Sequence, residues 1–210
     1  MLSAVTTFLL WLLPRLYDVP ATFDERVALH RNPYVAARLW VNFVHIFLAL
    51  AAYGAAAVRL SGRAPALAGG GFLWFVLWGF TELLGVTVNI FAVNRTWRAQ
   101  YEGAPADQRT QLRTNLAGFD AVWDAMFFLL LVAFLLGSLC YGLAFLREHG
   151  IGRWVGWLFL LAVPLTAAIM LGGYAGVTVF DGPVSAVYPV LQPVSRALLG
   201  WWLWPRSIRP

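Results

Sequence analysis

Residues Phe72–Val93 read FLWFVLWGFTELLGVTVNIFAV, and this stretch decides what kind of protein the chain forms. Its length and composition are those of a membrane-spanning helix, which needs about 20 predominantly apolar residues. Glu82 and Asn89 are its only strongly polar side chains. A carboxylate near the centre of a bilayer costs on the order of 2.5 kcal/mol or more, so Glu82 marks either a functional site or a buried partner.

The whole chain has the composition of a polytopic membrane protein. Of its 210 residues, 60% are hydrophobic and 12% are charged, whereas soluble domains have about 45–50% apolar and about 25% charged residues. All 15 basic residues other than histidine are arginines. Without lysine, a retinal Schiff base and pyridoxal-phosphate chemistry are excluded, since both need a lysine amine. The single cysteine, Cys140, excludes an intrachain disulfide and a thiolate metal cluster.

Long apolar segments predict an all-α integral membrane fold, a four-helix transmembrane bundle that forms one domain over residues 1–210. The expected spans are Leu39–Val58, Phe72–Val93, Ala121–Phe145 and Trp154–Phe180, each long enough to cross about 30 Å of hydrocarbon. Residues 94–119 are predicted to form a polar loop, in which Ala106–Leu116 would be a short surface helix.

The last predicted span has two further features. Pro164 predicts a tilt or a kink. Ala168, Gly172 and Gly176 form a stripe of small residues at helical spacing, which predicts close packing against a neighbouring helix.

Two terminal apolar segments are predicted to lie in the membrane interface. Leu2–Leu13 is too short to span the bilayer. Ala186–Trp204 is interrupted by Pro189 and Pro193 and ends in the aromatic run Trp201-Trp202-Leu203-Trp204, which is typical of an anchor at headgroup depth.

The distribution of arginine predicts the orientation. With four spans, the N-terminal tail, the 94–119 loop and the C-terminal tail share one side, and this side holds most of the arginines. The positive-inside rule then places both termini in the cytoplasm. The composition favours a bacterial inner membrane, and the arginines are expected to face anionic lipid and not nucleic acid.

Helical spacing gathers the polar side chains of the spans toward the cytoplasmic side. Asn42 and His45 share a face of the first span, and Trp78, Glu82 and Asn89 share a face of the second. Asp120 and Asp124 lie one turn apart where the third span begins. This pattern predicts a cavity that opens to the cytoplasm and is closed toward the outside.

We assign two sets of roles to these residues. Glu82, His45 and Asp124 are the candidates for acid–base catalysis or proton transfer, and the candidates for binding are Asn42, Trp78, Asn89 and Asp120. Each has a structural alternative: Glu82 would only fix helix packing through His45 or Asn89, and the aspartates would be favourable helix N-terminal charges. His45 has two more roles open to it, a structural hydrogen-bond donor or the single axial ligand of a haem or chlorophyll. The sequence identifies no other metal site and no cofactor.

Three functions agree with these observations. The absence of GxSxG, HExxH and phosphate-loop motifs favours a structural or cofactor-supporting subunit of a larger membrane complex. Its partners would be membrane lipids, other membrane proteins or a second copy of the chain. The second hypothesis is a membrane enzyme that acts on a lipid or isoprenoid, with Glu82 and His45 as its acid–base pair. The third is a proton-coupled carrier in which Asp124, Asn89, His45 and Glu82 form a relay.

Overall fold

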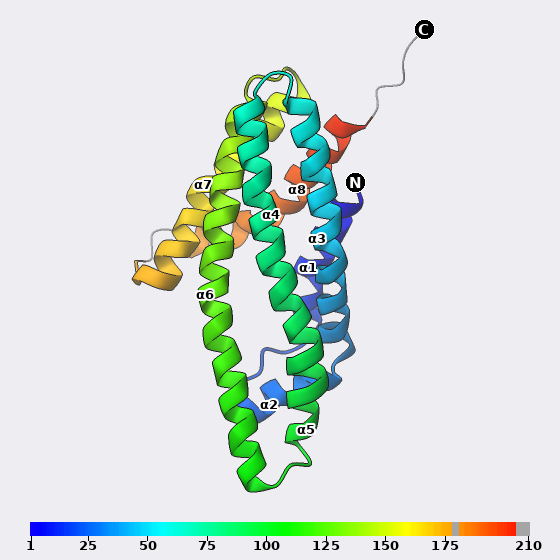
Figure 1. Ribbon diagram of the computed structural model, residues 1–210, viewed down its shortest axis with the longest axis vertical. Helices are drawn as coiled ribbons and strands as arrows, with labels where there is room; N and C mark the ends of the chain where they lie inside the picture. Colours follow the sequence, from blue (N-terminus) through cyan, green and yellow to red (C-terminus); the bar gives the residue numbers. More distant parts are fainter. Residues whose placement is uncertain (178–180, 205–210) are drawn as a thin grey trace.

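The computed structural model describes residues 1–177 and 181–204, with side chains described from residue 187 onward in the last helix. In this part of the chain the regular structure is entirely helical (Figure 1), which confirms the predicted all-α class. The elements are α1 (Leu2–Leu12), η1 (Leu13–Leu16), α2 (Phe23–Ala28), η2 (Leu29–Arg31), α3 (Pro33–Leu60), α4 (Pro65–Val88), η3 (Asn89–Arg98), α5 (Ala99–Tyr101), α6 (Ala106–Phe145), α7 (Ile151–Ala175) and α8 (Asp181–Leu203).

Four of these helical stretches are long and apolar enough to cross a membrane, as predicted. They are Pro33–Leu60, Pro65–Tyr101, Ala106–Phe145 and Ile151–Ala175. The first three predicted spans each lie inside one of them. The fourth was expected to reach Phe180, but α7 ends at Ala175, and residues 178–180 lie outside the described residues.

Local sequence sets where the helices begin. Asn32 caps α3 by accepting hydrogen bonds from the backbone of Tyr34 and Val35, and Pro33 occupies the first helical position, where proline needs no hydrogen-bond partner. Thr22 and Glu25 form a capping box at the start of α2, satisfying backbone N–H groups that the helix leaves free.

The predicted polar loop is mostly helix, which corrects the sequence interpretation. Ala106–Leu116 is not a separate surface helix but the first turns of α6, a single helix of 40 residues. Such a helix is about 60 Å long, about twice the hydrocarbon thickness. On the other side, the π-helix η3 continues α4, so the connection to α6 is the short turn 102–105. The polar residues therefore extend two long helices beyond their apolar parts.

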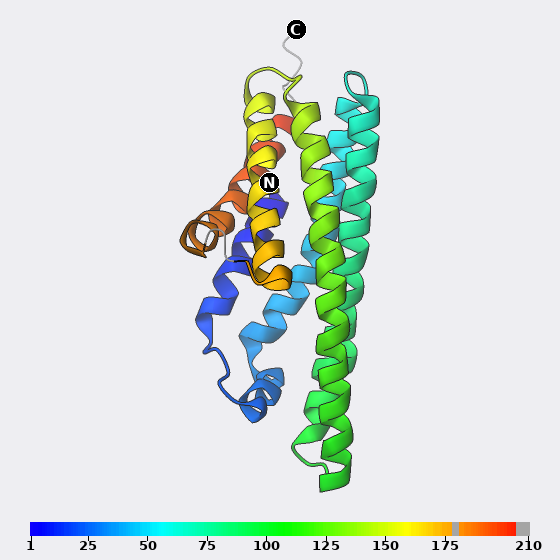
Figure 2. The same cartoon turned by 90° about the vertical axis from the view of Figure 1, so that its left-hand side faces the viewer.

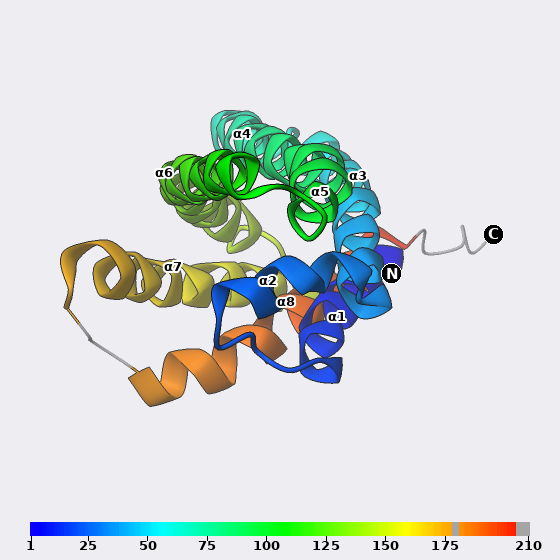
Figure 3. The ribbon, with the colours of Figure 1, turned by 90° about the horizontal axis from the view of Figure 1, so that it is seen from below.

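The long helices α3, α4 and α6 form an arc, and the other helices occupy its concave side (Figure 3). There α7 packs against α6, α8 packs between α7 and α1, and α1 packs against α3. The short helix α2 lies on the same side near the α5–α6 turn (Figure 1). The arc thus forms one layer of the molecule, and α1, α7 and α8 form a second layer against it.

Both terminal segments that were predicted to lie in the interface pack on the bundle, where α1 lies beside α3 and α8 crosses the other helices obliquely (Figure 2). α8 continues through Pro189 and Pro193, as helices among other helices tolerate when neighbours satisfy the freed backbone groups. Met1 lies against Gly200, where an added Cβ would come within 2.5 Å of the Met1 nitrogen. The two terminal helices therefore pack on each other and on α3.

The course of α8 also changes the predicted topology. The backbone carbonyl of Trp202 accepts a hydrogen bond from Arg59 at the end of α3, and its ring lies 4.9 Å from that of Phe145 at the end of α6. The described C-terminal segment therefore ends beside the α3–α4 turn, opposite the α5–α6 turn. The prediction that the C-terminal tail shares an end with residues 94–119 is wrong up to Trp204, and Arg206 and Arg209 lie outside the described residues.

An aromatic core joins the two layers near the α3–α4 turn. The rings of Tyr53 and Phe75 stack 3.9 Å apart, Tyr141 packs edge-on against both, and Phe159 packs against both at a tilt. The Tyr141 hydroxyl donates a 2.7 Å hydrogen bond to the Tyr53 carbonyl, which satisfies it in the buried interior. This cluster ties α3, α4, α6 and α7 to one another.

Candidate functional site

A cavity of about 270 Å³ between α3, α4 and α6 brings together three of the predicted site residues, Asn42, Glu82 and Asn89. It lies in the half of the bundle that points toward the α5–α6 turn, where the sequence also places the polar side chains. Its lining residues are Arg38, Leu39, Asn42, Glu82, Gly85, Val86, Asn89 and Trp123.

Glu82 and Asn42 form the central contact of this cavity. The Asn42 side-chain amide on α3 donates a 2.7 Å hydrogen bond to Glu82 Oε1 on α4. Both side chains are half-buried, so the second carboxylate oxygen stays within reach of a molecule in the cavity. This hydrogen bond fixes the Glu82 side chain in place.

Arg38 is a site residue that the sequence interpretation missed. It lies one helical turn before Asn42, and Nη1 donates a 3.1 Å hydrogen bond to the Tyr17 hydroxyl. Its i,i+4 spacing to Asn42 places the two side chains on one face of the helix, and this spacing was the signal that could have identified it. The cavity therefore combines a carboxylate with a guanidinium.

Asn89 connects the cavity to the π-helix. Asn94 Nδ2 donates to both the backbone carbonyl and the side-chain oxygen of Asn89, and Arg98 donates a 3.0 Å hydrogen bond to Asn94 Oδ1. π-Helical turns are rare in proteins as a whole, but those that occur are often found at functional sites. A line of hydrogen-bonded side chains thus runs from the cavity toward the α5–α6 turn.

His45 does not line this cavity. It is 3% exposed, and Nδ1 shares a 2.7 Å hydrogen bond with the Thr6 hydroxyl of α1. Among the described residues no hydrogen bond joins His45 to Glu82, so the predicted acid–base pair has separate partners. Its predicted role as an axial ligand stays a prediction, and the described residues hold no cluster of three potential metal ligands.

The remaining predicted residues lie at other places. Trp78 is 7% exposed and packs in the aromatic core. Asp120 pairs with Arg26 of α2 at 3.2 Å, and the backbone carbonyl of Asp124 accepts a hydrogen bond from Tyr174 at the end of α7. Both aspartate side chains are exposed, and none of these three residues lines the cavity with Glu82. The polar gradient in the sequence thus corresponds to several separate sites.

Arg196 on α8 is a buried cation whose burial the sequence did not reveal. It is 6% exposed, and its guanidinium lies 5.5 Å from the Tyr53 ring and 5.7 Å from the Trp78 ring. Nη1 donates to the Ser3 hydroxyl at 3.3 Å, whereas Nε has no hydrogen-bond partner among the described residues.

No family model, curated protein or solved structure matches this chain.

Proposed function

We propose that this chain is a membrane protein that binds the polar group of a lipid or isoprenoid amphiphile in the Glu82 cavity. The observation that carries the proposal is the Asn42–Glu82 hydrogen bond in the wall of a cavity that Arg38 also lines. Polar groups among apolar helices are energetically costly in a membrane unless a partner or a ligand binds them.

The lining suits the polar end of an amphiphile. Glu82 offers an acceptor, Arg38 offers donors, and the side chains of Leu39, Val86 and Trp123 form apolar walls. Pockets for whole drug-sized ligands measure about 300–1,000 Å³, so about 270 Å³ suits a headgroup. An apolar tail would extend along the lipid-facing surface, where side chains such as Phe80 and Leu73 are 63% and 70% exposed.

Catalysis at this site would depend on Glu82 without His45. Glu82 is the only carboxylate in the lining, and the hydrogen bond from His45 to Thr6 leaves the histidine outside it. This geometry gives less support to the predicted acid–base pair and to the predicted relay through His45. Binding is therefore the function that we propose first.

The proposal includes insertion into a bacterial inner membrane with the α5–α6 turn in the cytoplasm. Arginines at that end of the described chain outnumber those at the other end, which are Arg59, Arg63, Arg147 and Arg153. The positive-inside rule favours this orientation. The hypothesis that the chain is a subunit of a larger complex stays a prediction. It predicts that other polypeptides bind this chain.

The test is native mass spectrometry of the protein after gentle extraction from its own membranes. We expect a bound apolar molecule in the wild type and about tenfold weaker binding in Glu82→Gln and Asn42→Ala. Glu82→Gln replaces one acceptor oxygen by an amide donor, and Asn42→Ala removes the donor that holds Glu82. Asp107→Asn is the matched control, because it removes one carboxylate charge at an exposed position outside the cavity. Bound polypeptides and no small molecule, with the same result in Glu82→Gln, would favour the subunit hypothesis and contradict the proposal.

A further inference from the structure

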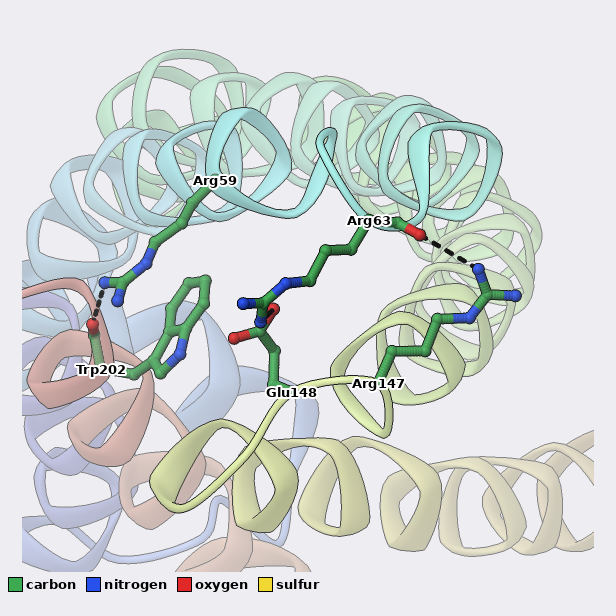
Figure 4. Close-up of polar contacts among 5 residues, drawn as sticks. All are labelled: Arg59, Arg63, Arg147, Glu148 and Trp202. Carbon is green, nitrogen blue, oxygen red and sulfur yellow. Dashed lines mark hydrogen bonds and ion pairs between the residues drawn. The ribbon is translucent and has the colours of Figure 1, made fainter.

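A second cavity, of about 250 Å³, lies at the opposite end of the bundle. It forms where the α3–α4 turn, the α6–α7 turn and the end of α8 meet (Figure 4). Its lining combines basic residues with three tryptophans: Arg59, Arg63, Glu148, His149, Ile151, Trp201, Trp202 and Trp204.

The charges in this cavity do not balance. Arg63 Nη1 and Glu148 Oε1 lie 2.5 Å apart and neutralise each other, and the Glu148 side chain is only 11% exposed. Arg59 forms no ion pair among the described residues. Its positive charge is therefore free to attract an anion in the cavity.

The guanidinium of Arg59 is held in position by Trp202. Its Cζ lies 4.0 Å from the Trp202 ring centroid, and Nη1 donates a hydrogen bond to the Trp202 carbonyl. The Trp202 ring is itself fixed, because it is 7% exposed and lies against Phe145 and Gly152. A guanidinium has five N–H donors, so several of them remain for a ligand in a fixed planar array that suits phosphate.

The tryptophans indicate what carries the phosphate. Trp201 and Trp204 are 60% and 66% exposed, and such side chains concentrate at the headgroup level of a bilayer. Val58, next to Arg59, is 77% exposed and offers an apolar surface to a tail. The cationic, aromatic cavity thus lies next to an exposed apolar side chain of α3.

We propose that this cavity binds the phosphate of an anionic phospholipid, with Arg59 as the principal contact. Anionic lipids are preferred over zwitterionic ones, because the charge of Arg59 is balanced by no carboxylate of the pocket. This site is independent of the Glu82 cavity.

The test is a titration of the delipidated full chain in detergent with phosphatidylglycerol or phosphatidylcholine, followed by native mass spectrometry. We expect tighter binding of phosphatidylglycerol and a reduction of about tenfold in Arg59→Gln, which removes a charge-assisted contact. Arg153→Gln is the matched control, because Arg153 is exposed near the same end of the bundle but does not line the cavity. Equal losses in the two variants, or no loss in either, would overturn the proposal.

Two further arms keep the test decisive. Arg59→Lys keeps the charge beside Trp202 and guards against a folding defect in Arg59→Gln, and it is expected to bind phosphatidylglycerol more weakly than wild type because lysine lacks the planar fork. Full affinity in this variant would mean that charge alone suffices and would contradict the proposal. Inorganic phosphate is expected not to displace the lipid at equal concentration, and displacement would identify a site for a soluble anion instead.

Discussion

Gly85 lets the Trp123 ring of α6 form one wall of the Glu82 cavity. A Cβ built on Gly85 would lie 1.8 Å from a ring carbon of Trp123, so only glycine permits this contact. Glycine inside a helix costs roughly 0.5–1 kcal/mol relative to alanine. Glycine at this position therefore lowers the stability of the helix but allows an aromatic side chain to pack against α4.

Gly85→Ala is expected to destabilise the protein by about 1–3 kcal/mol, because the added methyl group overpacks a tight contact. Gly118→Ala is the control, since a Cβ there meets nothing within 4 Å and helix propensity alone predicts an unchanged or slightly higher stability. Thermal unfolding in detergent measures both. Equal melting temperatures for the two variants would contradict the contact between Gly85 and Trp123.

The separation of His45 from Glu82 has a geometric cause that was not accessible from the sequence. Asn42 and His45 are three positions apart, which places their directions about 60° apart around α3. Asn42 is directed at α4 and bonds Glu82, whereas His45 is directed at α1 and bonds Thr6. Spacing placed both on one polar face, but it did not reveal that two different helices cover that face.

At the scale of elements, the length of the apolar segments predicted α3, α4, α6 and α7. Prolines and changes of polarity were less reliable signals of where a helix ends. Pro189 and Pro193 suggested an interrupted segment, but α8 is continuous. The 106–116 stretch was predicted as a separate helix because its polarity differs from that of the span that follows, but no proline interrupts the chain between the two, so α6 continues. Composition thus identifies the long apolar helices and does not mark where they end.

The close contact between α6 and α7 lies at glycines other than those that the sequence indicated. A Cβ on Gly156 would lie 3.0 Å from the Leu146 nitrogen and 3.1 Å from the Gly142 carbonyl oxygen. In contrast, the nearest described atom to a Cβ on Gly172, in the predicted stripe, is 4.0 Å away. Small residues permit close approach, but their spacing alone does not say which of them is used.

Gly156→Leu is therefore expected to separate α6 from α7 and to lower the melting temperature in detergent, because the obstructing atoms are backbone and cannot move aside. Gly172→Leu, on the same helix and with the same change in volume, is expected to leave the melting temperature close to that of the wild type. The reverse order would place the helix contact in the Ala168–Gly172–Gly176 stripe.

At the scale of the molecule, the two ends of the bundle differ in charge and in form. The end with the α5–α6 turn carries long polar helix extensions and ion pairs such as Arg26–Asp120. The other end has short turns, the cavity lined by Arg59 and the tryptophans of α8. The described C-terminal segment also ends at the α3–α4 turn. The predicted orientation therefore rests on the arginines of the 94–119 region and not on the C-terminal segment.

We expect the α5–α6 turn to face the cytoplasm and the α3–α4 turn to face the outside, following the positive-inside rule. Cys140→Ser removes the single native thiol, and Gln108→Cys or Gly62→Cys then places one exposed thiol at either end. A membrane-impermeant maleimide applied to intact cells should label the Gly62→Cys protein and label the Gln108→Cys protein only after the membrane is opened. The opposite pattern would invert the bundle, and the Glu82 cavity would then lie in the half of the protein that faces the outside of the cell.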